Sequence, residues 1–184
     1  MRVIAGSARR TPLVAPKGQN TRPTADRIKE NLFNIIAPYV PGARVLDLFC
    51  GSGAIGIEAL SRGAGEAVFV DSSRDAISAL TVNLARARLI GRIMPLCIFA
   101  AILMLNGEGM GFDIIFLDPP YGQGLLSKTM DELGKSNLLI PDGILIAECQ
   151  VDESEPESGP LILQDIRAYG NTRLMFYTFI RRNQ

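Results

Sequence analysis

A glycine-rich stretch in the first third of the chain constrains the fold most strongly. The segment VLDLFCGSGAIGIEAL, from Val45 to Leu60, runs from a strand-like apolar stretch through closely spaced glycines into a helix-like stretch. Gly51, Gly53 and Gly56 match the pattern G-x-G-x-x-G. Such a loop between a strand and a helix is typical of nucleotide cofactor binding in a parallel α/β sheet. A tight strand-to-helix turn without a ligand could use the same glycines.

The rest of the chain alternates between strand-like and helix-like segments. The expected strands are 44–49, 67–70, 93–98, 112–117, 143–149, 161–168 and 173–181, and the expected central helices are 54–62, 74–88 and 125–133. The last two strands are joined by Tyr169-Gly170-Asn171, a suitable hairpin turn. Because most of the strands are continuous apolar runs that alternate with helices, we predict an α/β fold, an open doubly wound and mostly parallel sheet.

The N-terminal part of the chain is basic. Residues 1–44 carry eight Lys and Arg against two acidic residues, whereas residues 142–165 carry seven acidic residues and no Lys or Arg. A basic block on a chain of zero net charge is typical of a surface that binds a polyanion, although a solvated arm would have the same composition. We therefore divide the chain into a basic extension, 1–22, and a main domain, 23–184.

Local patterns predict structure within this region as well. Segments 2–5 and 13–15 could pair as a small β-hairpin. An amphipathic helix should follow, with Thr24 as its N-cap and an apolar stripe on one face.

The composition excludes several kinds of site. The chain has no His, which excludes mechanisms with a His base, and its three Cys are far apart in sequence. We therefore expect no metal site, and we expect Cys50, Cys97 and Cys149 to be buried because each lies in an apolar run. No apolar run approaches the roughly 20 residues of a membrane-spanning helix, and the N-terminus does not resemble a secretory signal. A cytoplasmic protein without a membrane partner is expected.

Two carboxylates beside the glycine loop favour one cofactor over another. Asp71 ends the next strand 20 positions after Gly51, where a carboxylate can bind a ribose diol. Asp47 precedes the glycines, where it would repel the pyrophosphate of NAD but suit a cationic ligand. S-Adenosylmethionine carries adenosine, a sulfonium and an ammonium group, and no phosphate. We therefore predict S-adenosylmethionine as the cofactor, bound by Asp47, Phe49, Cys50, Gly51, Ser52, Gly53, Asp71 and Ser72.

A second motif, FDIIFLDPPYG, supplies groups that suit an aromatic amine. A buried strand ends in Asp118, and Pro119 and Pro120 then fix an extended backbone that lacks N–H donors. The Asp118 carboxylate and the Pro119 carbonyl can each accept one N–H of an exocyclic amine, while Tyr121 can stack on the base. The predicted catalytic residues are thus Asp118, Pro119, Pro120 and Tyr121, and their main contribution would be alignment of the amine with the methyl group.

The two motifs and the N-terminal segments together resemble a known family. The chain resembles class I S-adenosylmethionine-dependent methyltransferases that act on amino groups, and among these the bacterial small-subunit ribosomal RNA (guanine-N2)-methyltransferases of the RsmD family. The resemblance rests on RVIAGSARRTPL, TRPTADRIKENLFNII, VLDLFCGSGAIGIEALSRGA and FDIIFLDPPYGQGLL, of which the first two are the most specific. It implies a seven-stranded Rossmann-like sheet with an antiparallel last hairpin, and a guanine in 16S ribosomal RNA of an assembled or assembling small subunit as methyl acceptor.

The resemblance also gives the basic extension a role. It implies that RNA phosphates are contacted by Arg2, Arg9, Arg10, Lys17 and Arg22. The target guanine would be flipped into a pocket between Asp118 and Tyr121. One position departs from the family pattern: Phe99 stands where an acidic or amide residue usually lies near the adenine. Adenine contacts would then come from the backbone or from packing.

Other functions remain open from the sequence. An amino methyltransferase acting on adenine or cytosine in DNA or RNA could use the same Asp-Pro-Pro-Tyr motif, although no separate target-recognition domain is apparent for DNA. Glutamine methylation is disfavoured, because enzymes of that kind favour Asn at position 118. A non-catalytic RNA-binding scaffold is opposed by the presence of Asp47, Asp71 and Asp118 together. NAD-linked oxidoreduction is a more distant alternative.

Overall fold

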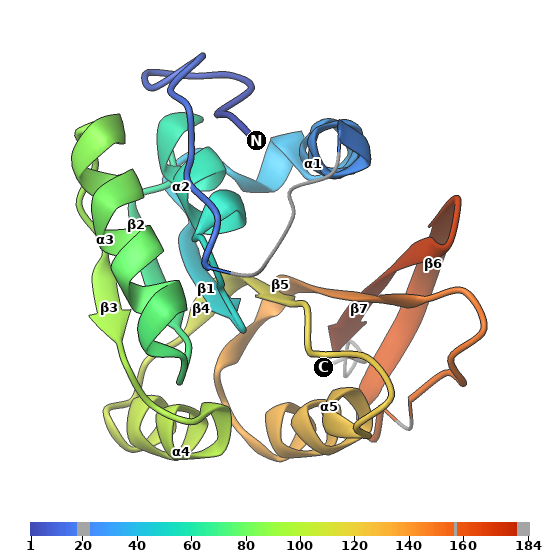
Figure 1. The fold of residues 1–184 in the computed structure, drawn as a ribbon. Helices are drawn as coiled ribbons and strands as arrows, with labels where there is room; N and C mark the ends of the chain where they lie inside the picture. Colours follow the sequence, from blue (N-terminus) through green and yellow to red (C-terminus); the bar gives the residue numbers. More distant parts are fainter. Residues whose placement is uncertain (18–22, 157, 180–184) are drawn as a thin grey trace.

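The computed structural model describes residues 1–17, 23–156 and 158–179 (Figure 1). In chain order its elements are α1 (Pro23–Ile35), the 3-10 helix η1 (Ala37–Tyr39), β1 (Arg44–Leu48), α2 (Ala54–Ser61), β2 (Glu66–Val70), α3 (Arg74–Ala87), β3 (Arg92–Met94), α4 (Ile98–Gly107), β4 (Phe112–Leu117), α5 (Leu125–Lys135), β5 (Leu139–Gln150), β6 (Leu161–Tyr169) and β7 (Thr172–Phe179). The strands form a single seven-stranded sheet in these ranges.

The strand order places a topological switch point at the centre of the sheet. The order is β3-β2-β1-β4-β5-β7-β6, so the chain leaves β1 toward β2 and β3 and then crosses to the other side of β1 to form β4. The pairs from β3 to β5 are parallel, whereas β7 pairs antiparallel with both β5 and β6. In such sheets, ligands bind beyond the carboxyl ends of the strands at the switch point. Here these are the ends of β1 and β4.

Helices cover the two faces of the sheet. In Figure 1, α1, α2 and α3 lie on one face and α4 and α5 on the other. The core splits in the same way: Val45 of β1 packs with the α1–α3 side, and its neighbour Leu46 packs with the α4–α5 side. Successive strand side chains point to opposite faces, which explains this alternation and the continuous apolar runs in the sequence. The predicted fold class, a mostly parallel α/β sheet with an antiparallel C-terminal hairpin, is confirmed.

The region after β2 differs from its prediction. The expected strand 93–98 is only three residues long in β3, and Ile98 begins the ten-residue helix α4, which the sequence pattern did not predict. A short apolar run does not distinguish a buried strand from a helix, and α4 also exposes Leu103 and Met104 on its outer side, which weakens its amphipathic pattern. Cys97 is exposed just before α4, so the prediction that all three thiols are buried is wrong for this one.

The N-terminal segment packs on the core of the α1–α3 side. In place of the expected hairpin between segments 2–5 and 13–15, the structure has one isolated antiparallel bridge, between Arg2 and Pro12. Next to it, the Val3 N–H donates to the Thr11 carbonyl (3.0 Å). Val3 and Leu13 are buried in the same cluster as residues of α1, α2 and α3. The following helix begins at Pro23, so the prediction of Thr24 as an N-cap is wrong.

Candidate active site

The loop after β1 adopts a strained, tightly turned conformation. Phe49, Gly51 and Gly53 have φ angles of 58°, 53° and 74°. Positive φ is easily adopted by Gly but costs free energy for a bulky residue such as Phe49, and backbone strain of this kind is concentrated at functional sites. The Cys50 N–H donates to the Val70 carbonyl (3.1 Å), and the Gly53 N–H donates to the Cys50 carbonyl (2.7 Å). The loop is thereby fastened to β2 as it enters α2.

The three glycines of the motif serve different purposes. A Cβ on Gly53 would lie 2.3 Å from Leu80 Cδ1, and a Cβ on Gly56 would lie 2.3 Å from Phe69 Cε1. These two glycines therefore allow α2 to pack closely against its neighbours. A Cβ on Gly51 would meet no atom within 4 Å. The backbone at Gly51 is thus open to approach by a ligand.

Asp71, at the carboxyl end of β2, holds this loop in place. Its Oδ2 accepts a hydrogen bond from the Gly51 N–H (2.9 Å), and its Oδ1 accepts one from the Ser73 N–H (2.8 Å). A carboxylate oxygen can accept more than one hydrogen bond, so both oxygens retain capacity for hydroxyl groups of a ligand. The predicted proximity of Asp71 and the glycine loop is therefore a direct contact.

Asp47 is buried beneath the loop. Its side chain is 2% exposed, and its Oδ2 accepts a hydrogen bond from the Gly56 N–H in the first turn of α2 (2.9 Å). Burial, opposed by the hydrogen bond from Gly56 and aided by the charges of Asp118 and Asp71, raises the pKa of Asp47 to about 8. The three predicted carboxylates are thus close enough to interact. The bond to Gly56 also gives Asp47 a role in positioning α2.

A fourth carboxylate, Glu148 of β5, lies beside Asp118 and was not predicted from the sequence. Leu117, the last residue of β4, is paired in register with Ala147 of β5, so Asp118, which follows β4, and Glu148 of β5 are neighbours. Burial raises the pKa of Asp118 to about 7. Burial, together with the charge of Asp118, raises the pKa of Glu148 to about 8. A Glu near the end of an apolar strand was the only signal in the sequence.

The turn after Asp118 displays the predicted aromatic residue. Pro119 is buried and Pro120 is exposed, while Tyr121 is 39% exposed. Burial raises the pKa of the Tyr121 hydroxyl, as do the charges of Asp118 and Glu148, whereas a hydrogen bond with Thr172 of β7 opposes the shift. Tyr121 therefore lies at the edge of the strand-end carboxylate cluster, which we define as Asp47, Asp118 and Glu148.

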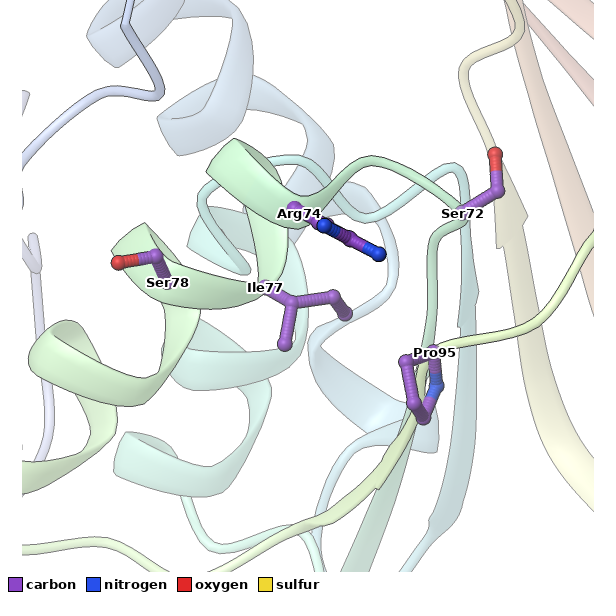
Figure 2. A pocket seen from close by; sticks show the side chains of 5 residues that line it. All are labelled: Ser72, Arg74, Ile77, Ser78 and Pro95. Atoms are coloured by element: carbon purple, nitrogen blue, oxygen red, sulfur yellow. The ribbon is translucent and has the colours of Figure 1, made fainter.

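Ser72 lies beside a cavity next to the predicted cofactor loop. The cavity has a volume of about 360 Å³ and is lined by Ser72, Arg74, Ile77, Ser78 and Pro95. In Figure 2 the side chains of Arg74 and Ile77 extend from α3 toward Ser72 and Pro95. None of its lining residues belongs to the glycine loop or to the Asp118 turn. Of the predicted site residues, the cavity includes Ser72 alone.

The predicted RNA-binding side chains lie on the surface of the N-terminal segment. Arg2, Arg9, Arg10 and Lys17 are exposed, whereas Arg22 lies outside the described residues. The backbone that carries them is anchored to α2. Glu58 accepts hydrogen bonds from the Ile4 N–H (2.7 Å) and the Ala5 N–H (3.0 Å).

Asn83 of α3 joins this segment to the glycine loop. Its side chain accepts a hydrogen bond from the Val14 N–H (2.8 Å) and donates to the carbonyls of Val14 and Ser52 (2.9 Å each). Asn83 is fully buried, and it was not predicted as a site residue because nothing local in the sequence identifies its partners. The predicted RNA-binding segment and cofactor loop therefore share one buried side chain.

Among the described residues, no group of three or more His, Cys, Asp or Glu side chains is arranged to hold a metal ion. In the same part of the chain, no helix has both the length and the apolar character needed to cross a membrane.

Comparison with known proteins identifies the family. The family model described as "Conserved hypothetical protein 95" matches residues 1–178. A Bacillus subtilis (strain 168) protein named provisionally as the rRNA methyltransferase YlbH is 39% identical over 180 residues, which cover 96% of this chain and 98% of that protein. The Escherichia coli (strain K12) ribosomal RNA small subunit methyltransferase D is 35% identical over 161 residues, covering 85% of this chain and 78% of that protein.

A solved structure agrees with this relationship. A hypothetical protein of Thermus thermophilus superposes with a TM-score of 0.85 at 30% sequence identity, covering 97% of this chain and 99% of that one. The family match spans the glycine loop, the Asp118 turn and the basic N-terminal segment alike. The resemblance seen in the sequence is confirmed: this chain belongs to the conserved hypothetical protein 95 family, the family of the ribosomal RNA small subunit methyltransferases D.

Proposed function

We propose that this chain transfers a methyl group from S-adenosylmethionine to the exocyclic N2 amine of a guanine in small-subunit ribosomal RNA. The observation that carries the proposal is the position of Asp118, a carboxylate with no basic partner among the described residues. It lies at the switch point of the sheet, where β1 and β4 end side by side. The names of the relatives, as methyltransferases of small-subunit RNA, support the same acceptor class.

The residues around the glycine loop fit the cofactor. S-Adenosylmethionine, when bound, supplies a methyl group carried on a positively charged sulfur. Asp47 and Asp118 are carboxylates whose pKa is raised by burial, to about 8 and about 7, so a nearby positive charge would stabilise their ionised forms. Gly51 leaves the backbone open for ligand approach, and Asp71 beside it can accept the ribose hydroxyls. Phe49, Cys50, Ser52, Gly53 and Ser72 would complete the binding loop.

The acceptor amine would be held by the Asp118 turn. Asp118 and the Pro119 carbonyl would each accept one N–H of the amine, which directs the nitrogen lone pair toward the methyl group. The amine loses one proton as it gains the methyl carbon, and Asp118, whose pKa burial raises to about 7, can accept that proton near neutral pH. Pro120 keeps the turn extended, and Tyr121 would stack on the base, which contributes about 1–3 kcal/mol per base.

The basic N-terminal segment would hold the RNA. Arg2, Arg9, Arg10 and Lys17 are exposed on a backbone that is anchored to α2, and Arg22 would extend the same surface. The substrate would be 16S ribosomal RNA in a small subunit or an assembly intermediate of it, in the cytoplasm. The target base would be flipped out of its helix to reach Asp118.

A methyl-transfer assay tests the proposal. Small ribosomal subunits from a strain that lacks this protein are incubated with the enzyme and S-adenosylmethionine carrying a tritiated methyl group, and the RNA is digested to nucleosides. We expect label in N2-methylguanosine, and none when subunits from the parent strain, already modified, are used. Label in methyladenosine or methylcytidine would overturn the acceptor, and failure to bind S-adenosylmethionine by calorimetry would favour a non-catalytic scaffold.

A further inference from the structure

We propose that Glu148 accepts a hydrogen bond from the ring N1–H of the target guanine and thereby selects guanine over other bases that carry an amine. This inference rests on the proposed function and assigns base specificity to a residue outside the Asp-Pro-Pro-Tyr turn. Asp118 and the Pro119 carbonyl accept N–H groups of an exocyclic amine, which guanine, adenine and cytosine all possess. The turn alone therefore cannot distinguish among the three bases.

The sheet places Glu148 where a neighbouring atom of the same base would lie. β4 and β5 are parallel and paired in register up to Leu117 and Ala147, so Asp118 and Glu148 follow on adjacent strands. Adjacent strands are about 4.8 Å apart. Phe116 and Ile146, two residues earlier on each strand, both pack on the α1–α3 side, so strand alternation directs Asp118 and Glu148 to the same face of the sheet.

Glu148 also lacks a partner that would explain its burial. Within the described ranges, no Lys or Arg forms an ion pair with Glu148, and no hydrogen bond engages its carboxylate. Its close electrostatic neighbours are themselves a carboxylate, Asp118, and a phenol, Tyr121. A partly buried acid in such surroundings is destabilising by itself and is typical of a site that receives a hydrogen-bond donor.

The hydrogen-bonding edge of guanine supplies the matching donors. In guanine the N2 amine lies next to a ring N1–H, so two adjacent groups donate. In adenine and cytosine the atom beside the amine is a ring nitrogen with a lone pair, which accepts. With the positively charged cofactor bound nearby, both acids are ionised, and the pair can therefore accept from both groups of guanine. With adenine or cytosine, an ionised Glu148 would face a lone pair and be left without a donor.

The experiment compares two acceptors that differ at ring position 1 and in the O6 carbonyl, which 2-aminopurine lacks; the Glu148 variants test the part of the preference that belongs to position 1. The methylated guanine is first mapped in small subunits, and subunits are then reconstituted with either guanine or 2-aminopurine at that position. 2-Aminopurine keeps the amine but has an acceptor in place of the N1–H. Initial methylation rates are measured for the wild type, Glu148→Gln and Glu148→Asp, with Glu132→Gln on the surface of α5 as the matched control.

We expect the wild type to prefer guanine over 2-aminopurine. Glu148→Gln, whose amide can donate to the ring nitrogen, should reduce that preference by about 5- to 150-fold, the range for one good contact to a base edge. Glu148→Asp should keep the preference at a lower rate, and Glu132→Gln should match the wild type. Loss of rate on both acceptors by the same factor in Glu148→Gln would overturn the inference. Absence of N2-methylguanosine with the wild type would instead overturn the proposed function.

Discussion

Two clusters of charge at buried or half-buried positions of this molecule are built in opposite ways. Around Glu58 of α2, every charge has a partner: Arg62 Nε lies 2.7 Å from Oε1, Lys29 Nζ lies 3.6 Å from Oε2, and backbone N–H groups of the N-terminal segment donate to both oxygens. The strand-end carboxylate cluster contains acids alone: burial raises the pKa of all three, and the charge of Asp118 adds to the shift of Asp47 and Glu148. The first cluster stabilises the fold, and the second is suited to a ligand that carries positive charge and hydrogen-bond donors.

The largest expected effect is the loss of stability when Glu58 is replaced. Glu58→Ala leaves Lys29 buried without its carboxylate and leaves the Ile4 and Ala5 N–H groups without their acceptor, so we expect the free energy of unfolding to fall by about 3–5 kcal/mol. Urea denaturation measures it. The control is Glu66→Ala, which breaks the exposed pair with Arg44 (3.1 Å) and should cost less than about 1 kcal/mol. Equal losses in the two variants would mean that the Glu58 cluster does not fasten the fold.

The second largest effect is expected at Asp118 of the strand-end carboxylate cluster, where a substitution should lower activity but not stability. Asp118→Asn removes the carboxylate that holds the amine, so methyl transfer should fall by roughly 10²–10³-fold, as for loss of one strong transition-state contact. Its free energy of unfolding at pH 8 should not fall, because the substitution removes repulsion with Glu148. Asp131→Asn, on the surface of α5, is the control for both measurements. A large loss of stability in Asp118→Asn would show that this carboxylate is structural.

The stability of the folded chain should depend on pH through the strand-end carboxylate cluster. The pKa values of Asp118 and Glu148 in the folded chain, about 7 and about 8 because of burial, lie above those of unfolded acids near 4. The folded state therefore holds protons that the unfolded state has lost, so this contribution to stability is present at low pH and decreases as the pH rises toward 8.

Removing one of these groups should flatten that decrease. Between pH 5 and pH 8, we expect Glu148→Gln to lose less stability than the wild type does, by about 1–2 kcal/mol. Urea denaturation at several pH values measures the difference, with Glu132→Gln as the control. Parallel pH profiles for wild type and Glu148→Gln would contradict the assignment of raised pKa values to the cluster.

The smallest expected effect concerns the exposed Arg9 and Arg10 on the N-terminal segment, whose backbone is anchored by Glu58. Replacing Arg9 by Ala and Arg10 by Gly should weaken RNA binding and reduce the slope of log affinity against log salt by about 1 for each phosphate that the protein no longer neutralises. Gly is chosen at position 10 because Arg10 has a φ of 72°. Lys128→Ala, on α5 across the sheet, should leave the slope unchanged. An unchanged slope in the double variant would remove the N-terminal segment from the RNA interface.

Local sequence motifs were sufficient to predict part of the site. The glycine loop, Asp71 and Asp118 each stand at the end of a strand-like run, and strand ends in a parallel sheet converge on one edge, so their proximity followed from spacing alone. Glu148 and Asn83 could not be predicted in this way. Their partners are far away in sequence, and the register of β4 with β5 and the packing of α3 on the N-terminal segment are needed to find them.

The amino-acid sequence by itself determined the fold class, the family and the two motifs that point to methyl transfer, because short-range patterns of glycine, proline and apolar residues specify backbone turns and buried strands. The tertiary structure alone decided that position 98 begins a helix, that Glu58 and Lys29 form a buried ion pair, and that Glu148 stands beside Asp118. Charge compensation and strand register are properties of residues brought together by folding, and no local window of the chain contains them.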